Sequence, residues 1–460
     1  MINKSLTERL LGIALAAGAD FAELYWELTR NGGITLLGGK IDAISDNTVT
    51  GVGIRAFIGT RTVYGSTSDL SEEGLLACAR SVAGAIGDGA DAPSVVLKER
   101  CVPDIHPVKI DPATADVKDK CDLLKLASEA AYKYDNRIVQ AAGNLITVDH
   151  TIGIANTEGL LVTDRHVRTR MAIEAVASDG AENQSGRCSP GRGMGLEVFD
   201  LFDPAEIGRT ASAQAITNLT ADYCPAGQMT VAIENGFGGV IFHEACGHSL
   251  EATSVSIGMS EMCGKLGKQI ANEKITAIDD GTIPNAWGSV NIDDEGNPTQ
   301  RNVLIENGVL KSYMVDRLGS RRMGLPMTGN SRRESYLYEP TSRMTNTFID
   351  NGPDKNEDII ASIEYGLYAK SMGGGSVNPL TGAFNFAVTE GYIVRNGKIC
   401  EPVRGASLVG TGAEILKDID MVGQNLDVGQ GMCGSSSGSV PTDVGQPLIR
   451  VSKITVGGRK

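Results

Sequence analysis

Apolar and polar residues alternate in two different ways along the first half of the chain. Between residues 6 and 17, apolar side chains recur every three or four positions, which is typical of an amphipathic helix. We place the start of this helix at Ser5, because Ser5 and Glu8 have the spacing of a capping box. The same periodicity predicts helices over 69–86, 115–134 and 204–219. Period-two alternation predicts strands over 33–45, over 50–66 with a turn at Gly59, and within 137–178.

Proline and glycine interrupt both patterns at 223–227, where we place a domain boundary. Beyond it the chain is mostly β-structure, and Asn307-Gly308 and Asn396-Gly397 predict hairpin turns. A chain of 460 residues also exceeds what one hydrophobic core usually serves. We therefore predict an α+β protein. An N-terminal mixed α/β domain with antiparallel strands covers 1–222, and a β-rich, barrel- or sandwich-like domain covers 223–460. Residues 186–195, rich in glycine and arginine, are expected to form a loop.

One short segment of the C-terminal domain concentrates metal-binding chemistry. His243-Glu244-Ala245-Cys246-Gly247-His248 places two of the five histidines of the chain on either side of a glutamate. Neutral imidazole nitrogens are good zinc ligands, and a carboxylate can take a proton from a metal-bound water that attacks a carbonyl carbon. The segment therefore predicts a metallohydrolase, and most simply a metallopeptidase, with Glu244 as general base. The alternative is a half-buried helix that carries two histidines and a solvated Glu244.

The spacing HExxxH makes a geometric demand on its helix. On a straight α-helix, positions five apart differ by about 140°, whereas positions four apart, as in HExxH, differ by about 40°. His243 and His248 can therefore meet at one ion only if the helix carries an extra residue, as in a π-bulge. We expect that distortion here, and we expect Gly247 to tolerate it.

A catalytic zinc usually takes three protein ligands, so a third must come from outside the two histidines. The candidates are Cys246, Glu251, Cys263 and Cys433, and spacing alone does not choose among them. Cys433 lies in a glycine-rich stretch, where a side chain can approach an ion without steric hindrance. A lone cysteine such as Cys246 is more often a small buried apolar residue than a ligand.

Several motifs in order resemble the TldD/PmbA family, and specifically the TldD branch that retains HExxxH. After HEACGHSLE come RMTNT at 343–347, GGGSVNP at 373–379, FNF and EGY between 384 and 392, GTG at 410–412 and GMCG at 431–434. The resemblance implies a zinc-dependent peptidase whose metal is held by His243, His248 and Cys433, with Glu244 as general base. It also implies a dimer, formed with an identical subunit or with a family member that lacks HExxxH.

The expected substrates follow from the β-rich C-terminal half. An extended peptide can join a strand edge through main-chain hydrogen bonds, which read the backbone and not the side chains. We therefore expect broad specificity for flexible or unfolded peptides. Two other classes of function stay open: a thiol hydrolase that uses Cys246 or Cys433, and a non-catalytic assembly subunit or partner-binding module with a structural metal site.

Composition limits the binding partners and the cellular location that we expect. A net charge of −14 and a pI of about 5.0 argue against general nucleic-acid binding. Nine cysteines without paired spacing favour free thiols and the cytoplasm, and no stretch has the roughly 20 apolar residues of a membrane span. The apolar run at 10–19 could also serve as a short export signal, but its helical periodicity argues against this.

Positive charge gathers in one place, between residues 317 and 343. We weigh two interpretations: a solvated or salt-bridged face, and a group that grips a peptide carboxylate or an acidic partner. The arginines are Arg317, Arg321, Arg322, Arg332, Arg333 and Arg343.

Overall fold

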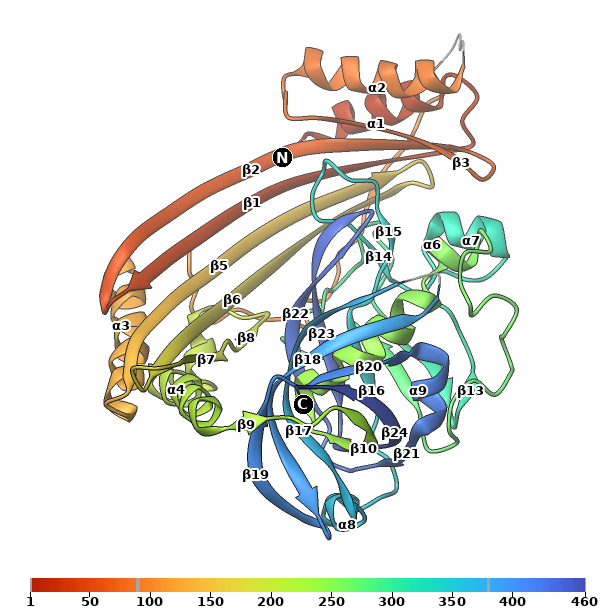
Figure 1. The fold of residues 1–460 in the computed structure, drawn as a ribbon. Coiled ribbons are helices and arrows are strands. Elements are labelled where there is room, and N and C mark those ends of the chain that lie inside the picture. Colours follow the sequence, from red (N-terminus) through yellow and green to blue (C-terminus); the bar gives the residue numbers. More distant parts are fainter. Residues whose placement is uncertain (1, 88–91, 379–380, 460) are drawn as a thin grey trace.

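The first half of the protein is built on one long, curved and largely antiparallel sheet (Figure 1). The computed structural model describes residues 2–87, 92–378 and 381–459. The strands follow the order β3-β2-β1-β5-β6-β4, and β7 and β8 also pair with β6. Their bounds are β1 Phe21–Leu37, β2 Lys40–Ile58, β3 Arg61–Thr67, β4 Lys98–Glu99, β5 Ile138–Asn156, β6 Leu160–Ser178, β7 Asn183–Cys188 and β8 Gly191–Arg192.

Two predictions about this sheet are wrong in detail. The predicted strand over 33–45 spans a hairpin, because Gly38 and Gly39 adopt positive φ values of 57° and 74° and turn β1 into β2. The stretch 186–195 is not simply a loop, since half of it forms the end of β7 and all of β8, which pair with β6. The turn at Gly59 is confirmed, with a φ of 56° between β2 and β3.

Alternation along the strands divides the sheet into two faces. Leu24 and Trp26 of β1 pack under α1 and α2 at one end, and Ile34 and Leu36 pack under α3 and α4 at the other. Tyr25 faces the opposite way, toward the C-terminal region. The helices are α1 Lys4–Leu15, α2 Glu72–Ile86, α3 Val117–Tyr134 and α4 Pro204–Thr220, with the short η1 Leu196–Asp200 before α4.

The first helix begins two residues earlier than the capping-box prediction. The N-cap is Asn3, whose side-chain oxygen accepts a hydrogen bond of 2.8 Å from the Leu6 amide. Ser5 lies inside the helix, so the prediction that it caps the helix is wrong. Asn is as good an N-cap as Ser, and the helix therefore has the stabilisation that the capping box was expected to supply.

The C-terminal half contains a closed barrel of five strands. β17, β10, β24, β20 and β18 pair in that order, and β18 pairs back to β17. β19, β9 and β21 extend this sheet, as Figure 1 shows in blue and green around the C-terminus. The bounds are β9 Asp222–Tyr223, β10 Gly227–Ile233, β17 Tyr365–Val377, β18 Ala383–Arg395, β19 Lys398–Arg404, β20 Ser407–Thr411, β21 Ile419–Val422 and β24 Ile449–Gly457. The expected barrel-like C-terminal region is confirmed.

A second, six-stranded sheet lies between the barrel and the long sheet. Its order is β13-β12-β11-β16-β23-β22, so β22 is its last strand. The predicted hairpin turns are confirmed, because Asn307 and Asn396, each followed by a glycine, adopt the left-handed conformation. The strands are β11 Ala277–Asp280, β12 Arg301–Glu306, β13 Val309–Leu310, β16 Asn346–Ile349, β22 Asp427–Ser435 and β23 Gly438–Gln446, with the small pair β14 Ser331–Arg332 and β15 Thr341–Ser342. The helices α7 Arg317–Met323, α8 Asn356–Ala361 and α9 Gly412–Asp418 complete this region.

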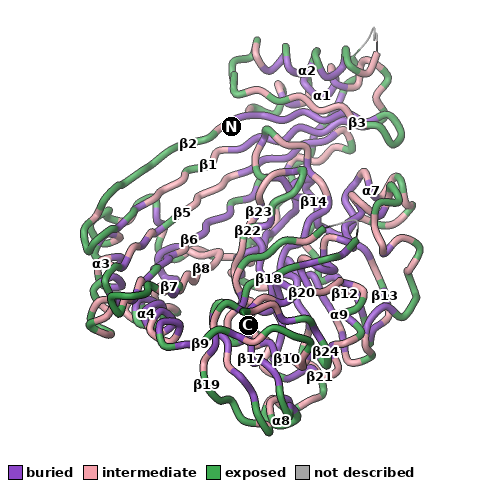
Figure 2. Tube along the Cα trace, in the orientation of Figure 1, coloured by how far each residue is buried: buried purple, intermediate pink, exposed green. Residues whose placement is uncertain are grey.

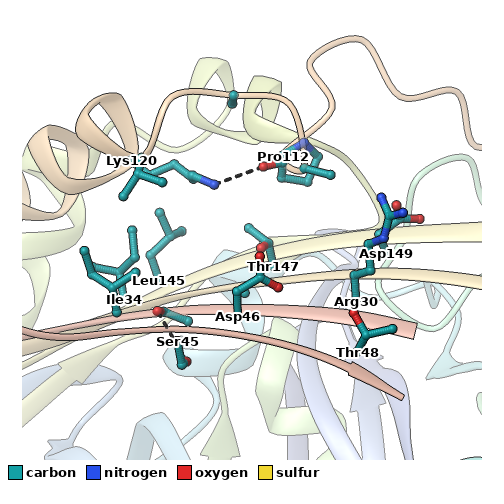
Figure 3. Close-up of a pocket in the computed structure, with 16 residues that line it drawn as sticks. Arg30, Ile34, Ser45, Asp46, Thr48, Pro112, Lys120, Leu145, Thr147 and Asp149 are labelled. Carbon is teal, nitrogen blue, oxygen red and sulfur yellow. Dashed lines mark hydrogen bonds between the residues drawn. The ribbon is translucent and has the colours of Figure 1, made fainter. Parts of the chain in front are cut away.

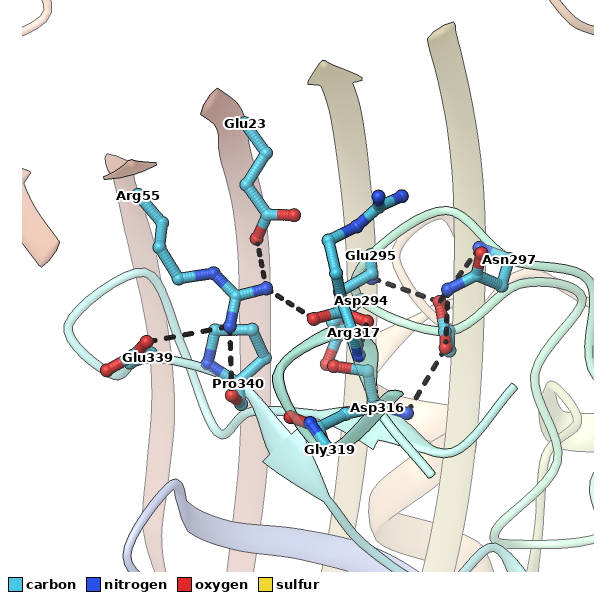
Figure 4. A network of polar contacts seen from close by, with 12 residues as sticks. Glu23, Arg55, Asp294, Glu295, Asn297, Asp316, Arg317, Gly319, Glu339 and Pro340 are labelled. Atoms are coloured by element: carbon cyan, nitrogen blue, oxygen red, sulfur yellow. Dashed lines mark hydrogen bonds and ion pairs between the residues drawn. The ribbon is translucent and has the colours of Figure 1, made fainter. Parts of the chain in front are cut away.

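Buried charge joins the long sheet to the C-terminal region. Arg55 of β2 is 1% exposed and lies 2.8 Å from Glu23 of β1. The same guanidinium also pairs with Glu295 and Glu339 of the C-terminal half (Figure 4). Figure 2 shows that burial is continuous across this junction, whereas the opposite ends of β1 and β2 are exposed. Removing one member of such a network would leave the others as unpaired buried charges.

Candidate metal centre

The HExxxH segment is a widened helical turn. The chain passes from η2 Gly236–Gly239 through α5 Val240–Phe242 into a π-helix, η3 His243–Gly247, and leaves it through η4 His248–Leu250 and α6 Ala252–Val255. The amide of His248 donates to the carbonyl of His243, five residues earlier. The two imidazole rings lie with their centroids 5.2 Å apart. The expected π-distortion is confirmed, and it brings together two side chains that a straight helix would separate.

Cys433 approaches this pair from the other end of the sequence. Its side chain projects from β22, and its Sγ lies 3.2 Å from Nε2 of His243 and 3.3 Å from Nε2 of His248. All three donor atoms lie within 4.8 Å of one another. The thiol is 190 residues from His243 along the chain, so only the packing of the six-stranded sheet against the helix places it here.

Glu251 occupies the outer side of His248. Its Oε1 lies 3.1 Å from Nδ1 of His248, and the residue is only 3% exposed. A carboxylate that accepts the Nδ1 hydrogen leaves Nε2 free to donate electrons, which is the tautomer a metal ligand needs. Arg343 lies 3.8 Å from the same oxygen and also donates to the carbonyl of Cys433. Glu251 is therefore placed to orient a histidine and not to supply the third donor.

The electrostatics of the cluster favour a bound cation. Burial raises the pKa of the Cys433 thiol, but His243 and His248 outweigh it and lower that pKa to about 4. Burial lowers the pKa of His248, but the carboxylate of Glu251 and the thiol of Cys433 outweigh it and raise that pKa well above its usual value. Two imidazoles and a thiolate form the nitrogen and sulfur donor set that zinc prefers. The residues present therefore fit a zinc ion.

Glu244 lies at the open side of the cluster. Its Oε2 is 3.8 Å from Nε2 of His248, and its side chain is 27% exposed. It is thus a carboxylate that solvent can reach while it lies beside one of the three donor atoms. This position is the one that a general base requires.

The other candidate ligands turn away from the cluster. Cys246 is fully buried in the main core, its Sγ faces the Gly412 carbonyl at 3.8 Å, and burial raises its pKa. Cys263 instead donates to the Val255 carbonyl at 3.5 Å. The interpretation of Cys246 as a small buried apolar residue therefore agrees with its surroundings, and a neutral, inaccessible thiol is a poor nucleophile.

Gly247 is required for space and not for backbone freedom. Gly247 lies within the expected π-distortion, but its φ and ψ of −56° and −50° are ordinary helical values that other residues also adopt. A Cβ at this position would lie 2.3 Å from Sδ of Met344, which is completely buried. Met344 thus packs directly against the backbone between the two histidines.

The arginines between 317 and 343 do not form one surface. Arg317 pairs with Glu158 at 2.9 Å and Arg321 with Asp20 at 2.5 Å, both across to the N-terminal half. Arg343 is buried at the metal cluster. The sequence pointed to this stretch but did not single out Arg343 or Met344. Their role depends on contacts with residues 251 and 247, which no local pattern reveals.

Comparison with known proteins places this chain in a family. Sequence models match three parts of the chain: the PmbA/TldA metallopeptidase domain 1 over residues 22–86, the central domain over 110–219 and the C-terminal domain over 226–458. The chain belongs to the PmbA/TldD family of metallopeptidases. The cluster of His243, His248 and Cys433 lies within the part matched by the C-terminal domain.

Relatives extend over the whole chain. A Haemophilus influenzae protein named metalloprotease TldD homolog is 37% identical over 453 residues, which cover 95% of this chain and 93% of the relative. A Methanothermobacter thermautotrophicus metalloprotease is 32% identical, covering 95% and 96%. A Saccharolobus solfataricus protein named zinc metalloprotease TldD homolog is 33% identical over 263 residues, covering 57% and 58%.

Solved structures share the fold. TldE from Thermococcus kodakarensis matches with a TM-score of 0.78 and 19% identity, covering 98% of this chain and all of that one. A Thermotoga maritima protein described as a candidate modulator of a DNA gyrase matches with a TM-score of 0.81 and 24% identity, covering 99% and 100%. In the described part of this chain, no helix combines the length and apolar character needed to cross a bilayer.

A separate hollow lies over the long sheet, away from the metal cluster. It has a volume of about 300 Å³ and lies between β1, β2 and β5 and the segment before α3 (Figure 3). Arg30, Asp46 and Asp149 point into it, and none of the residues of the metal cluster lines it. It therefore has no direct part in the metal site.

Proposed function

We propose that this protein is a zinc-dependent peptidase that hydrolyses flexible or unfolded peptides. The observation that carries the proposal is the convergence of His243, His248 and Cys433 across a π-helical turn, with Glu244 beside them. Membership of a metallopeptidase family and the name of the Saccharolobus solfataricus relative, a zinc metalloprotease TldD homolog, support zinc and peptide hydrolysis.

The residues of the cluster have separate tasks in this proposal. His243, His248 and Cys433 would hold the ion through their Nε2, Nε2 and Sγ atoms, and Glu251 would keep His248 in the required tautomer. Zinc, when bound, supplies a Lewis acid that polarises the scissile carbonyl and makes water acidic enough to attack near neutral pH. Glu244 would accept the proton of that water at its carboxylate and pass it to the leaving amine.

The position of the thiol supports an extended peptide as substrate. Cys433 lies on β22, which is the last strand of its sheet, so the site is next to a sheet edge and not inside a sheet. A peptide held along such an edge by main-chain hydrogen bonds must be unfolded over several residues. Broad specificity follows, because main-chain contacts are the same for most sequences.

The decisive experiment exchanges the carboxylate of Glu244 for an amide. Glu244→Gln should abolish cleavage of an unfolded polypeptide, while zinc content by metal analysis and the circular dichroism spectrum stay unchanged. The matched control is Glu273→Gln, which makes the same chemical change at an exposed position outside the cluster. Full activity in Glu244→Gln would remove the general base from the mechanism and would leave the thiol hydrolase as the alternative.

A thiol hydrolase is the second candidate, because Cys433 has a lowered pKa beside two imidazoles. A chelator separates the two functions. Removing the metal should abolish activity in a metallopeptidase and leave a thiol hydrolase active. Alkylation cannot distinguish them, since Cys433 would be lost either way.

The subunit arrangement and the location also remain proposals. We propose that the protein is a dimer, with an identical subunit or with a family member that lacks HExxxH. The exposed ends of β1 and β2, with Leu37 at 51% and Ile44 at 55%, support a covering partner. Nine free cysteines support a reducing compartment such as the cytoplasm. Light scattering of the purified protein, alone and after co-expression with such a family member, measures the assembly.

A further inference from the structure

A cavity of about 580 Å³ lies between the long sheet and the β22–β23 hairpin. Its walls are mainly apolar and include Trp287, Val148 and Ile292. Met432 and Pro441, which face each other across β22 and β23, close it on the side of the C-terminal half. Figure 1 shows this hairpin directly below the inner side of the long sheet.

The cavity and the metal cluster lie on opposite faces of the β22–β23 hairpin. Met432 lines the cavity, and consecutive residues of a strand point to opposite faces, so Cys433 carries its thiol to the other side of the same hairpin. Arg332 connects the two places, because it lines the cavity and donates to the carbonyl of Met344, which packs against Gly247. A peptide that crosses the edge of β22 would meet the cluster on one face of the hairpin and the cavity on the other.

Two arginines of the cavity wall lack an anionic partner. Arg168 is 4% exposed and donates only to the carbonyls of Trp287 and Ser289. Arg332 is 5% exposed and donates only to the carbonyls of Met344 and Pro441. A guanidinium has five N–H donors, so both groups keep donors to spare. Among the described residues, neither forms an ion pair with a carboxylate.

In the described part of the chain, the carboxylates around Arg168 and Arg332 do not form ion pairs with the two guanidinium groups. Burial and the neighbouring Arg332 together lower the pKa of Arg168 to about 9, although Asp294, Asp164 and Asp443 act against this. Asp294 lines the same cavity, but it binds the backbone amide of Arg333 at 2.7 Å. By contrast, Arg55 and Arg317 each contact a carboxylate within 3 Å. Buried charges in proteins are normally paired, and a missing partner points to a ligand.

We propose that this cavity is a subsite for a carboxylate of the peptide substrate, held by Arg168 and Arg332. The inference rests on the proposed peptidase function and names its preferred substrates: peptides with a carboxylate close to the cleaved bond. The carboxylate belongs either to an Asp or Glu side chain or to the C-terminus of the peptide. Planar guanidinium groups suit both, because each offers paired donors that match the two oxygens.

The test measures binding without turnover. The Glu244→Gln variant is titrated by calorimetry with four N-acetylated alanine pentapeptides: one with a central aspartate, one with a central asparagine, and all-alanine peptides with a free or an amidated C-terminus. The three peptides other than the all-alanine free acid are amidated at the C-terminus. We expect at least one carboxylate peptide to bind about tenfold or more tightly than its neutral counterpart. The pair that shows the difference identifies the source of the carboxylate.

Variants then locate the preference. Arg332→Gln and Arg168→Gln, each added to Glu244→Gln, should reduce the preference for the carboxylate peptide. The dissociation constant of the neutral peptide divided by that of its carboxylate counterpart should fall toward one. Arg165→Gln is the matched control, because Arg165 lies on the same strand, β6, but pairs on the outside with Asp149 at 2.7 Å. Its ratio should stay unchanged. The inference would be overturned if the Glu244→Gln protein, with both arginines intact, bound carboxylate and neutral peptides equally well. This comparison needs no arginine variant.

The same peptides separate this inference from the proposed function. Cleavage of all four by the unmodified enzyme at equal kcat/KM, with equal binding, refutes the carboxylate subsite and leaves the peptidase intact. A tenfold binding preference without cleavage of any unfolded polypeptide refutes the peptidase and supports the anion-binding cavity.

Discussion

Gly247→Ala tests how tightly the metal-binding turn is packed. The added methyl group would lie 2.3 Å from Sδ and 3.1 Å from Cε of Met344, a side chain with no exposed surface and hence no room to retreat. Overpacking of this kind costs about 1–3 kcal/mol. Because the backbone at Gly247 is helical, alanine also gains about 0.5–1 kcal/mol over glycine. We expect a net loss of about 1–2 kcal/mol in the free energy of unfolding.

In a protein that lacks the Met344 side chain, Gly247→Ala should raise the free energy of unfolding instead of lowering it. Met344→Ala alone should cost about 2–5 kcal/mol, since it empties a buried site. Adding Gly247→Ala to Met344→Ala should then stabilise the protein by about 0.5–1 kcal/mol, because the clash is gone and only the helical preference remains. Urea unfolding of the metal-free proteins, followed by circular dichroism, measures all four corners of the cycle.

Gly84→Ala is the control for this cycle. Gly84→Ala lies in α2 with nothing within 4 Å of its added Cβ, so it should stabilise the protein by about 0.5–1 kcal/mol. If Gly247→Ala were equally destabilising with and without Met344, the contact would not explain the glycine. Backbone strain in the π-turn would then have to account for it.

Three further predictions follow from the site and the junction. Glu251→Gln should weaken zinc binding about 10–100-fold in a chelator competition, and unchanged affinity would remove its orienting role. In the metal-free protein, the Cys433 thiolate should persist down to about pH 4, because its folded pKa is depressed from 9.0 to about 4. Its contribution to stability is full above the unfolded thiol's pKa and is lost as pH falls toward 4, and the ultraviolet absorbance of the thiolate, compared with Cys433→Ser, measures this. Arg55→Gln should lower the free energy of unfolding in urea by about 3–5 kcal/mol, because it leaves buried carboxylates without a partner. Arg9→Gln, which removes an exposed ion pair, should lower it by at most about 1 kcal/mol. Equal losses would contradict the buried network.

The local sequence pattern predicts the helical turn of the metal site but does not identify its third donor. The five-residue spacing of His243 and His248 already required a widened helical turn, and η3 has that geometry. The residues alone left Cys246, Glu251, Cys263 and Cys433 open as partners. Resemblance to a family implied Cys433, and the structure places its sulfur beside both rings. Spacing could not decide, because the contact joins residues 190 positions apart.

The sequence by itself determined most helices, strands and tight turns, because periodicity and turn residues act over a few neighbours. Asn307-Gly308 and Asn396-Gly397 are examples, since their left-handed conformations are local preferences. Only the tertiary structure decided that 186–188 and 191–192 would pair with β6, because the partner strand supplies the hydrogen bonds. It likewise separated the arginines of 317–343 into ion pairs and unpaired cavity groups. Their partners include Asp20 and Glu158 of the N-terminal half and Glu251 and Pro441 of the C-terminal half, and no local pattern encodes those contacts.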